Sequence, residues 1–561
     1  MSRRISHFVF TFVLVGVLVA CVPGSSQTGD AQSTQVDPSA FHIVAGSEVK
    51  ALESAGVFTD FAEYAKSLKG ADGQLLYPDG VKVQLSYKGS VDIKNSLARL
   101  KDTPNLGVDA YWPASSLWLA GSVSPDPVSI ARTYIVLAVR PDVAKSLSWS
   151  GNQVTLEQVL DAIRAGQLNL AMTSASQSNS GASFYLASLS YLCGKPVLAS
   201  ECLSDPSVTD AIKTLLGAVD RPSESSGNLK TAFVADYTSG APKYGAMVNY
   251  ESLVIEANQE LVNKGVAPLN VFYVEGATAI ADEPLRYADN GSADKKAQYS
   301  ALVAYLQTPE VQAKIQSLGW RTGLVGMALE SPDEKVFNPA WGIDTETEFQ
   351  SMTYPKQAVI EAALVQYQSA FRKPSFTVYC LDFSGSMNSN GGEGRLHEAM
   401  NLILDQSKAS EVLLQAGPGD YTLVYGFNEK VYQIGDPVSG NDTTAYANLA
   451  QRVEGTYADS GTNIFGCAEQ ALAQVAANYD QTRYNYAVVV MTDGASNAGP
   501  SASDFVNDYR SANIPVPFYG ITFGSGADAS QLKVMTDATG GVVYDGSSDL
   551  VSTFKKVKGN N

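Results

Sequence analysis

Three segments in the C-terminal third of the chain place oxygen-bearing residues beside predicted strands, and this arrangement strongly restricts the fold. The first strand, Phe376 to Leu381, stops at Asp382, and Ser384 and Ser386 follow at alternate positions. That spacing lets one carboxylate and two hydroxyls face a single point beyond the strand end. Three hard oxygens suit a hard divalent cation such as Mg²⁺, Mn²⁺ or Ca²⁺. For this segment alone, a Ser- and Gly-rich turn that merely ends a strand is the alternative.

The other two segments favour the cation over the plain turn. The polar turn from Ser460 to Ile464 contains Thr462 and precedes a helical stretch. The apolar run from Tyr486 to Met491 is typical of a central parallel strand, and Asp493 follows it within Thr492-Asp493-Gly494. Strand ends of a doubly wound sheet share one edge, so the oxygen-bearing residues of all three segments are expected to meet there.

Residues 374–561 resemble the von Willebrand factor type A domain, which has a doubly wound, Rossmann-like α/β fold and a metal-ion-dependent adhesion site. The D-x-S-x-S motif is intact, and the later threonine and aspartate fit the second and third loops of that site. The resemblance implies direct metal binding by the serines, state-dependent binding by the threonine and largely water-mediated binding by the aspartates. It also implies Mg²⁺ as the metal and a partner protein that offers a carboxylate to it. The implied ligands are Asp382, Ser384, Ser386, Thr462 and Asp493.

Strands and helices also alternate between residues 41 and 325. Phe41 to Ala45, Val81 to Leu85 and Val108 to Trp112 are predicted strands, each followed by a turn with small hydroxyl residues. A later strand enters a polar loop from Ser174 to Ser183, and the next helix is expected to begin at Phe184. Such alternation predicts a mostly parallel sheet with ligands beyond its strand ends. Hydroxyls and free N–H groups at helix starts are suited to anions.

This half resembles bacterial extracellular solute-binding proteins of the two-lobed, type II periplasmic kind. The shared marks include Ala45-Gly46-Ser47, Gly89-Ser90, the loop from Thr173 to Ser183, and the late helical stretch from Leu302 to Gly319. The resemblance implies two α/β lobes, a hinge and a cleft for a small molecule. Few basic residues lie near the turns, which leaves a neutral solute or an oxyanion held by hydroxyl and N–H groups. The implied ligand-binding residues are Ser47, Ser90, Ser115 or Ser116, Ser180, Gly181 and Tyr250.

The first 21 residues form a targeting segment with a basic start and an apolar stretch from Phe8 to Val19. Its end, Leu18-Val19-Ala20-Cys21, resembles a bacterial lipobox, which implies lipidation of Cys21 and anchoring to the cell membrane. An ordinary signal peptide cleaved nearby is the alternative. Pro23 to Pro38 is rich in Ser, Gly, Thr and Gln and is expected to be a flexible tether.

Four cysteines remain in an extracytoplasmic setting where disulfides persist. Cys193 and Cys202 are close enough in sequence for a local bridge. Cys380 and Cys467 either pair or stay as buried thiols. The expected organisation is a signal peptide (1–21), a tether (22–40), a solute-binding-like domain (41–325), a connector (326–373) and the von Willebrand factor type A domain (374–561).

Charge and histidine content narrow the function. A formal net charge of −18 argues against nucleic acid as a partner. Only three histidines occur; His42 lies within a predicted strand, and His397 is expected in solvent. No P-loop, H-E-x-x-H or G-x-S-x-G motif is present. The sequence therefore favours a non-enzymatic, lipid-anchored protein with metal-dependent recognition of another protein, and the alternative is the substrate-binding component of a membrane transporter.

Overall fold

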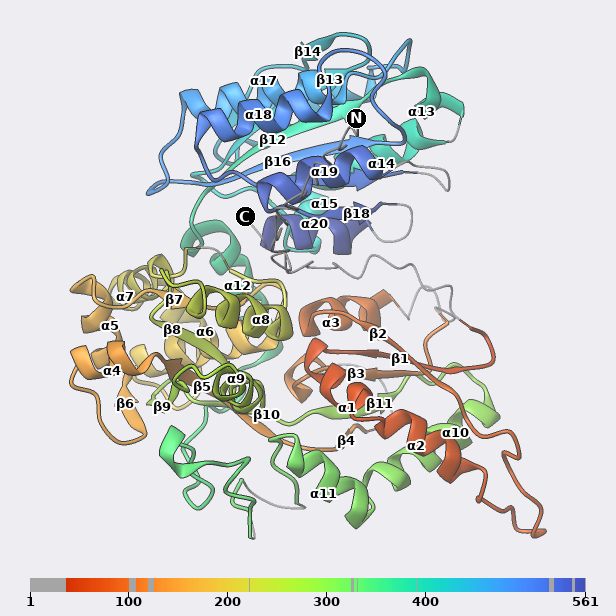
Figure 1. Ribbon diagram of the computed structural model, residues 1–561, viewed down its shortest axis with the longest axis vertical. Coiled ribbons are helices and arrows are strands. Elements are labelled where there is room, and N and C mark those ends of the chain that lie inside the picture. The colour runs from red at the N-terminus through yellow and green to blue at the C-terminus, as the bar shows by residue number, and fades with distance from the viewer. Residues whose placement is uncertain are drawn as a thin grey trace, which may run out of the picture.

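The computed structural model describes residues 37–99, 107–119, 126–220, 222–323, 327–329, 331–389, 391–523, 529–546 and 550–559. The predicted signal peptide, Cys21 and most of the predicted tether lie outside these ranges. The described residues form three sheets. Figure 1 shows two of them in adjacent lobes and the third in a C-terminal domain that sits across both lobes.

Lobe one, residues 41–131 and 282–318, is built on a five-stranded sheet in the order β2-β1-β3-β11-β4. Strands β1, β2 and β3 are parallel because helices return the chain between them. Strand β11 pairs antiparallel with both of its neighbours, β3 and β4. Phe41, Ile43 and Trp112 from the sheet pack with Phe61 and Leu302 from covering helices. Its elements are β1 (Phe41–Ala45), η1 (Ser47–Val49), α1 (Lys50–Ser54), α2 (Val57–Ala65), β2 (Val83–Tyr87), α3 (Ser90–Arg99), β3 (Ala110–Trp112), η2 (Ser116–Trp118), β4 (Val128–Ser129), β11 (Pro284–Tyr287), α10 (Ala293–Leu306) and α11 (Pro309–Ser317).

Lobe two, residues 132–281 with a return segment up to 371, has a sheet in the order β6-β9-β5-β8-β7, and β10 pairs with β5. Apolar cores lie on both faces of this sheet, since alternate residues of β5 belong to different clusters. Its elements are β5 (Thr133–Val139), α4 (Pro141–Ser146), β6 (Gln153–Thr155), α5 (Leu156–Arg164), β7 (Leu170–Ala171), α6 (Asn179–Leu192), η3 (Ser200–Ser204), α7 (Pro206–Gly217), α8 (Ser226–Tyr237), β8 (Ala246–Tyr250), α9 (Glu251–Asn263), β9 (Asn270–Glu275), β10 (Ala279–Ala281), η4 (Pro339–Trp341), α12 (Gln357–Gln366) and η5 (Tyr367–Phe371).

The start of α6 differs from the sequence-based expectation. The helix begins at Asn179 rather than at Phe184, so Ser180 and Gly181 lie in its first turn and not in a loop. Small polar residues favour loops locally, but here tertiary hydrogen bonds satisfy them. Gly181 N donates to Thr173 Oγ1 at 2.8 Å, and Ser183 Oγ donates to Asn179 Oδ1 at 2.8 Å.

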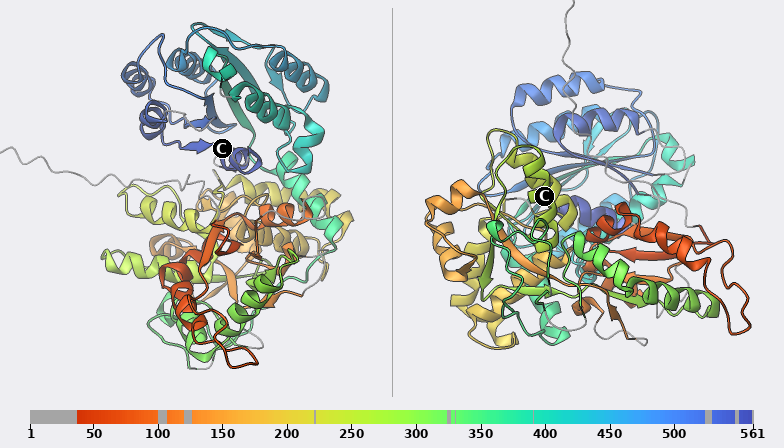
Figure 2. Two further views of the ribbon diagram at one scale, coloured as in Figure 1. Left: turned by 90° about the vertical axis from the view of Figure 1, so that its right-hand side faces the viewer. Right: turned by 60° about the horizontal axis from the view of Figure 1, so that its bottom comes forward.

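Much of the predicted connector, residues 326–373, packs on lobe two, and Tyr354 and Glu361 also contact Ser115 and Lys94 of lobe one. Val359, Ile360 and Ala363 of α12 belong to the lobe-two core, and the Tyr185 hydroxyl donates to Ala363 O at 2.9 Å. Trp341 joins the core on the other face of the sheet. The C-terminal domain is therefore attached to lobe two through a packed segment (Figure 2).

The C-terminal domain, residues 375–559, is a doubly wound α/β sheet in the order β14-β13-β12-β16-β17-β18. Helices α14, α16 and α20 cover one face, and α17, α18 and α19 cover the other. The expected α/β fold class is confirmed for both halves. The elements are β12 (Ser375–Asp382), α13 (Gly385–Ser389), α14 (Gly392–Leu404), α15 (Gln406–Glu411), β13 (Tyr421–Phe427), β14 (Val431–Gln433), β15 (Val438–Ser439), α16 (Thr443–Glu454), α17 (Ile464–Ala477), β16 (Asn485–Thr492), α18 (Ala502–Ala512), β17 (Phe518–Thr522), α19 (Ser530–Thr539), β18 (Val543–Asp545) and α20 (Leu550–Gly559).

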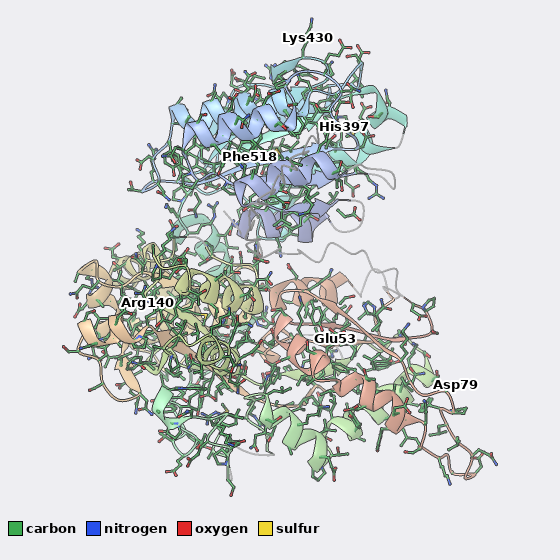
Figure 3. The ribbon with its side chains drawn as sticks, in the orientation of Figure 1. Glu53, Asp79, Arg140, His397, Lys430 and Phe518 are labelled. Carbon is green, nitrogen blue, oxygen red and sulfur yellow. A yellow bond between two sulfur atoms is a disulfide. The ribbon has the colours of Figure 1, made fainter. Side chains whose placement is uncertain are left out.

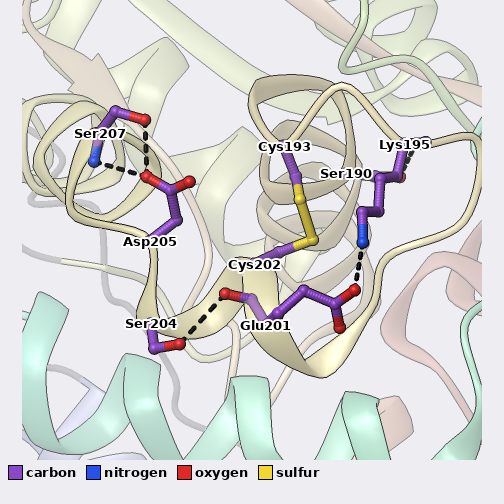
Figure 4. Close-up of a disulfide and its surroundings, with 8 residues drawn as sticks. All are labelled: Ser190, Cys193, Lys195, Glu201, Cys202, Ser204, Asp205 and Ser207. Carbon is purple, nitrogen blue, oxygen red and sulfur yellow. Dashed lines mark hydrogen bonds and ion pairs between the residues drawn. A yellow bond between two sulfur atoms is a disulfide. The ribbon is translucent and has the colours of Figure 1, made fainter.

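Two disulfides tie local structure in both halves. Cys193 and Cys202 form a bridge between the end of α6 and η3, beside the Lys195–Glu201 ion pair (Figure 4). Cys380 of β12 and Cys467 of α17 form the second bridge, inside the C-terminal core. In the part of the chain that the structure describes, no helix is long and apolar enough to cross a membrane.

Candidate metal centre and lobe interface

The candidate metal centre lies at the carboxyl ends of the two central strands of the C-terminal sheet. Strands β12 and β16 pair in parallel, with Leu381 opposite Met491, so Asp382 ends beside Thr492. Both strands are buried along their whole length. The Thr492 hydroxyl donates to Asp382 Oδ2 at 2.5 Å, and Ser384 N donates to Asp382 Oδ1 at 2.7 Å. Asp382 is thereby fixed at the sheet edge with both carboxylate oxygens oriented.

The two serines and the second aspartate complete a continuous group of oxygens. Ser384 Oγ and Ser386 Oγ are 3.1 Å apart, and Ser386 Oγ donates to Asp493 Oδ1 at 2.7 Å. Ser386 lies in α13, because the segment predicted as a turn forms a short helix from Gly385 to Ser389. Four of the five predicted metal-binding residues therefore stand in one hydrogen-bonded group.

Thr462 lies in the loop that borders this group. Gly385 N donates to Ser460 O at 2.9 Å, which joins the loop to the D-x-S-x-S segment. The Thr462 backbone is held from the other side: its N–H donates to Asn497 Oδ1 at 2.8 Å, and its carbonyl accepts from Ser496 Oγ at 3.1 Å. Sequence reasoning missed Asn497 and Ser496. Their position as polar residues shortly after Asp493, beyond the strand from Tyr486 to Met491, was a usable signal.

The electrostatics of this edge favour a cation. Asp382 is fully buried, and burial raises its pKa to about 6, with the nearby Asp493 charge acting in the same direction. Hydrogen bonds from Thr492 and Ser384 pull the pKa partly back. Within the described residues, no group of three or more His, Cys, Asp or Glu side chains could hold a metal. A metal at this edge would therefore rely on hydroxyl oxygens, which the two serines supply, and the donor set fits a hard divalent ion.

The histidines lie elsewhere. His42 is buried in lobe one, with Nδ1 2.7 Å from Gly107 O and Nε2 2.8 Å from Ser86 Oγ. His397, expected in solvent, is half-buried on α14 of the C-terminal domain (Figure 3). It shares a surface pocket with Glu393, Glu454 and Tyr457. Neither histidine is hydrogen-bonded to the acidic group described above.

The predicted solute-binding residues divide into two sets. Ser90 Oγ accepts from Ala114 N at 3.2 Å and Ser115 Oγ accepts from Leu117 N at 3.3 Å, so both serve local structure in lobe one. Ser47 Oγ instead accepts from Gly227 N of lobe two at 3.2 Å. Ser115 Oγ also lies 2.8 Å from the Tyr354 hydroxyl of the return segment, so Ser47 and Ser115 both contact lobe two.

The lobe-two candidates lie in a buried polar layer. Ser180 Oγ is 2.9 Å from both Thr173 Oγ1 and Ser226 Oγ. Tyr250 ends β8 and is 1% exposed. The layer touches lobe one directly, since Trp118 Nε1 donates to Asn179 Oδ1 at 2.8 Å. Sequence reasoning missed Trp118, Asn179 and Ser226, which carry no motif of their own.

The lobes are in close contact in this structure. Val91 N of lobe one donates to Gln177 O of lobe two at 3.3 Å. Apolar residues of lobe one, among them Trp118, belong to the main core cluster of lobe two. Two buried acids that the sequence analysis did not consider as site residues, Glu48 and Glu283, also lie at this junction.

Comparison with known proteins gives two family matches. Residues 52–321 match the model of the bacterial extracellular solute-binding protein, and residues 377–556 match the model of the von Willebrand factor type A domain. A search of curated proteins found no match.

Solved structures include similar chains of both kinds. Maltose-bound MalE3 of T. maritima is 11% identical, with 74% of this chain and 98% of that chain covered at a TM-score of 0.40. An ABC transporter solute-binding protein from Agrobacterium radiobacter K84, in complex with ribitol, is 10% identical over 51% of this chain and 80% of that one, at 0.37. A von Willebrand factor type A protein from Catenulispora acidiphila is 16% identical over 34% of this chain and 43% of that one, at 0.28. The two family matches, at residues 52–321 and 377–556, indicate an extracellular solute-binding domain followed by a von Willebrand factor type A domain.

Proposed function

We propose that this protein is a lipid-anchored, extracytoplasmic binding protein whose C-terminal domain holds a divalent cation, Mg²⁺ in the first instance, and recognises a protein partner through it. The observation that carries the proposal is the hydrogen-bonded group of Asp382, Ser384, Ser386 and Asp493 at one sheet edge. The family match of residues 52–321 favours an extracytoplasmic location, and the lipobox-like end at Cys21 supplies the anchor.

The side chains at this edge suit recognition better than hydrolysis. Ser384 and Ser386 would bind the cation through hydroxyls, Thr462 would add a third, and Asp382 and Asp493 would hold water and orient the serines. Neutral oxygens leave the bound cation able to accept a carboxylate oxygen from a partner. Asp382 and Asp493 already accept hydrogen bonds from Thr492, Ser384 and Ser386, which suits them to hold the site in place rather than to act as a general base, and domains of both matched families are generally binding domains.

The last helix links this domain to both lobes. Lys555 of α20 donates through Nζ to Asp92 Oδ1 of lobe one at 2.6 Å, and its carbonyl accepts from Gln177 Nε2 of lobe two. Lys555 is 2% exposed, so this is an internal contact. Helix α20 therefore contacts both lobes. Because a solute bound between the lobes would change their relative position, it would also affect the C-terminal domain through α20.

The test uses the full chain. Mg²⁺ binding is measured by calorimetry, and binding to immobilised cell-envelope proteins is then compared in Mg²⁺ and in EDTA. We expect Mg²⁺-dependent binding that Asp382→Ala abolishes and that Asp436→Asn, at an exposed position of the same domain, leaves intact. Equal binding in Mg²⁺ and EDTA would disprove the proposal.

A second function, delivery of a solute to a membrane permease, is favoured by the family match of the lobed half and by the buried polar layer between the lobes. It predicts that a solute raises the unfolding temperature of the lobed half equally in the wild type and in Asp382→Ala. All five tryptophans, at positions 112, 118, 149, 320 and 341, lie in that half, so tryptophan fluorescence follows it separately from the C-terminal domain.

A further inference from the structure

Two glutamates are buried at the junction of the lobes, and no ion pair joins either of them to a lysine or arginine in the described part of the chain. Glu283 is fully buried where the chain passes from β10 in lobe two to β11 in lobe one, and Glu48 is 4% exposed in η1. Among the described residues, neither carboxylate oxygen of Glu283 has a hydrogen-bond partner, and Oε1 of Glu48 has none. Leaving such oxygens unpaired inside a protein is costly, so their retention needs a reason.

The backbone holds Glu283 in place. Its N–H donates to Ala114 O at 3.0 Å, and its carbonyl accepts from Ile130 N at 3.2 Å. Its φ of 41° is in the left-handed region, which costs energy for a residue with a side chain. The strand crossing therefore fixes the direction of this side chain even though the carboxylate has found no partner.

The two carboxyls and the Tyr250 hydroxyl lie close enough for their charges to act on one another. Burial raises the pKa of Glu283 well above its usual range, and the charge of Glu48 raises it further. Both acids also act on Tyr250, whose pKa burial raises strongly. Besides burial, the charges of Glu48 and Asp282 raise the pKa of Glu283, and a backbone hydrogen bond lowers that of Glu48. In the described part of the chain, no Lys or Arg charge offsets the burial of either acid.

An independent observation marks the same place as a ligand position. Asn179 is 1% exposed, and its amide faces the Tyr250 hydroxyl and lowers the pKa of that tyrosine, although its Nδ2 has no partner within ordinary hydrogen-bond distance among the described residues. Its Oδ1 is occupied by Trp118 Nε1 and Ser183 Oγ, which fixes the amide orientation. Three segments of the chain thus bring Asn179, Glu48 and Glu283 to the same tyrosine, and both oxygens of Glu283 and Oε1 of Glu48 have no partner among the described residues.

We propose that the junction between the lobes binds a small organic ammonium compound, with its cationic group between Glu48 and Glu283 and an acceptor oxygen on Asn179 Nδ2. This inference rests on the second proposed function and names its solute class. An oxyanion, which the sequence left open, would face two acids and no base. A divalent metal ion is less suited, because Ca²⁺ needs six or more oxygens and no metal-binding group of three acidic, His or Cys residues exists in the described part of the chain.

The test measures unfolding of the full chain by tryptophan fluorescence, with ethanolamine, putrescine, ribitol, sulfate and CaCl₂ as separate probes, followed by calorimetry for each probe that shifts the transition. We expect ethanolamine or putrescine to bind and the other three to have no effect. Glu283→Gln and Glu48→Gln are each expected to weaken ammonium binding by about 10- to 100-fold. Glu63→Gln, at an exposed position of α2, is the matched control.

Each outcome decides between the claims. A shift with ribitol alone would overturn the ammonium assignment and leave solute binding standing. A shift with CaCl₂ that both glutamine variants remove would replace the ammonium group by a metal ion. No shift with either ammonium probe would overturn the inference. Folding of the variants is checked by their unfolding without ligand, and Mg²⁺ binding at Asp382 is measured in parallel, so the metal-dependent function is judged separately.

Discussion

The edge of the C-terminal sheet and the junction of the lobes both bury acids, yet they treat them differently. At the sheet edge, Asp382 and Asp493 accept hydrogen bonds from Thr492 and Ser386. At the junction, Glu283 has no partner for either oxygen among the described residues. Carboxylates whose orientation is fixed by hydrogen bonds form a preorganised site that suits a small hydrated ion. Unpartnered acids are better satisfied by a ligand that brings both charge and hydrogen-bond donors.

A third buried acid, Glu251, is stabilised in another way, by a countercharge from the protein itself. Glu251 is fully buried and receives two hydrogen bonds of 2.8 Å from Arg321, from Nε and Nη2. The Tyr273 hydroxyl also donates to it. The chain can therefore neutralise a buried glutamate with arginine, which makes the missing partners of Glu48 and Glu283 informative.

The largest expected effect comes from removing that internal countercharge. Arg321→Met leaves Glu251 buried and unpaired, and we expect the lobed half to lose about 3–5 kcal/mol of unfolding free energy. Urea unfolding followed by tryptophan fluorescence measures this. Lys314→Met, which removes an exposed ion pair with Asp60, should cost less than about 1 kcal/mol. If Arg321→Met and Lys314→Met lowered the free energy of unfolding equally, the buried arginine would not be needed to stabilise Glu251.

The next effect is a pH dependence at the junction. Burial raises the pKa of Glu48 from 4.5 to about 7, and Glu283, Asp282 and Tyr250 are the titratable groups near this cluster. The folded state therefore binds the proton more tightly than the unfolded chain. Stability is fully present below pH 4.5 and is lost as the pH rises to about 7, by about 3 kcal/mol. Glu48→Gln should remove this part of the profile, and a difference curve that does not fall over that range would contradict it.

A smaller change is expected at the sheet edge. Asp382→Ala should weaken Mg²⁺ binding by about 10- to 100-fold, since this acid is expected to act through water and through the serines. Calorimetric titration of the full chain gives the ratio, and Asp436→Asn should match the wild type. If the alanine variant binds Mg²⁺ as tightly as the wild type, the metal does not depend on this edge.

The smallest expected effect concerns α20. Lys555→Ala removes the contact with Asp92, whose carboxylate is 15% exposed and can be hydrated once the lysine is gone, so we expect the lobed half to lose only about 1 kcal/mol. The more telling readout is coupling, because any ammonium-induced change in Mg²⁺ affinity should shrink in this variant. Lys533→Ala, which breaks an exposed pair with Asp537 on α19, is the control and should leave the coupling unchanged. Unchanged coupling in Lys555→Ala would exclude the Lys555–Asp92 contact as the link, since the variant keeps the backbone contact of α20 with Gln177.

The parts that followed from sequence are those set by local pattern. The strand Phe41–Ala45 was predicted at its observed bounds, and the strand predicted from Tyr486 to Met491 is longer by one residue at each end, because apolar, β-favouring residues end there at turn residues. The D-x-S-x-S segment and Asp493 were expected at one edge, and parallel pairing of β12 with β16 brings them together. Their role as metal ligands remains a prediction.

The parts that did not follow depend on contacts between distant segments. The start of α6 at Asn179 is stabilised by Thr173 and Trp118, so local propensity misplaced it. The burial of Glu48 and Glu283 was not predicted, since nothing nearby in sequence marks either acid as buried. The contact between Lys555 and Asp92 joins residues 463 positions apart, a distance at which no sequence pattern exists.

The route of the chain through its three bodies has a mechanical consequence. The chain enters through β1 of lobe one and reaches the C-terminal domain from α12 of lobe two. Tension between an anchored N-terminus and a captured partner would therefore run through the crossings between the lobes. The Lys555–Asp92 contact offers a shorter path that joins the C-terminal domain to lobe one directly. While the Lys555–Asp92 contact is intact, the tension would bypass the crossings between the lobes. Once this contact breaks, the same tension would pull the lobes apart, so the contact of α20 would set the force at which the lobes separate.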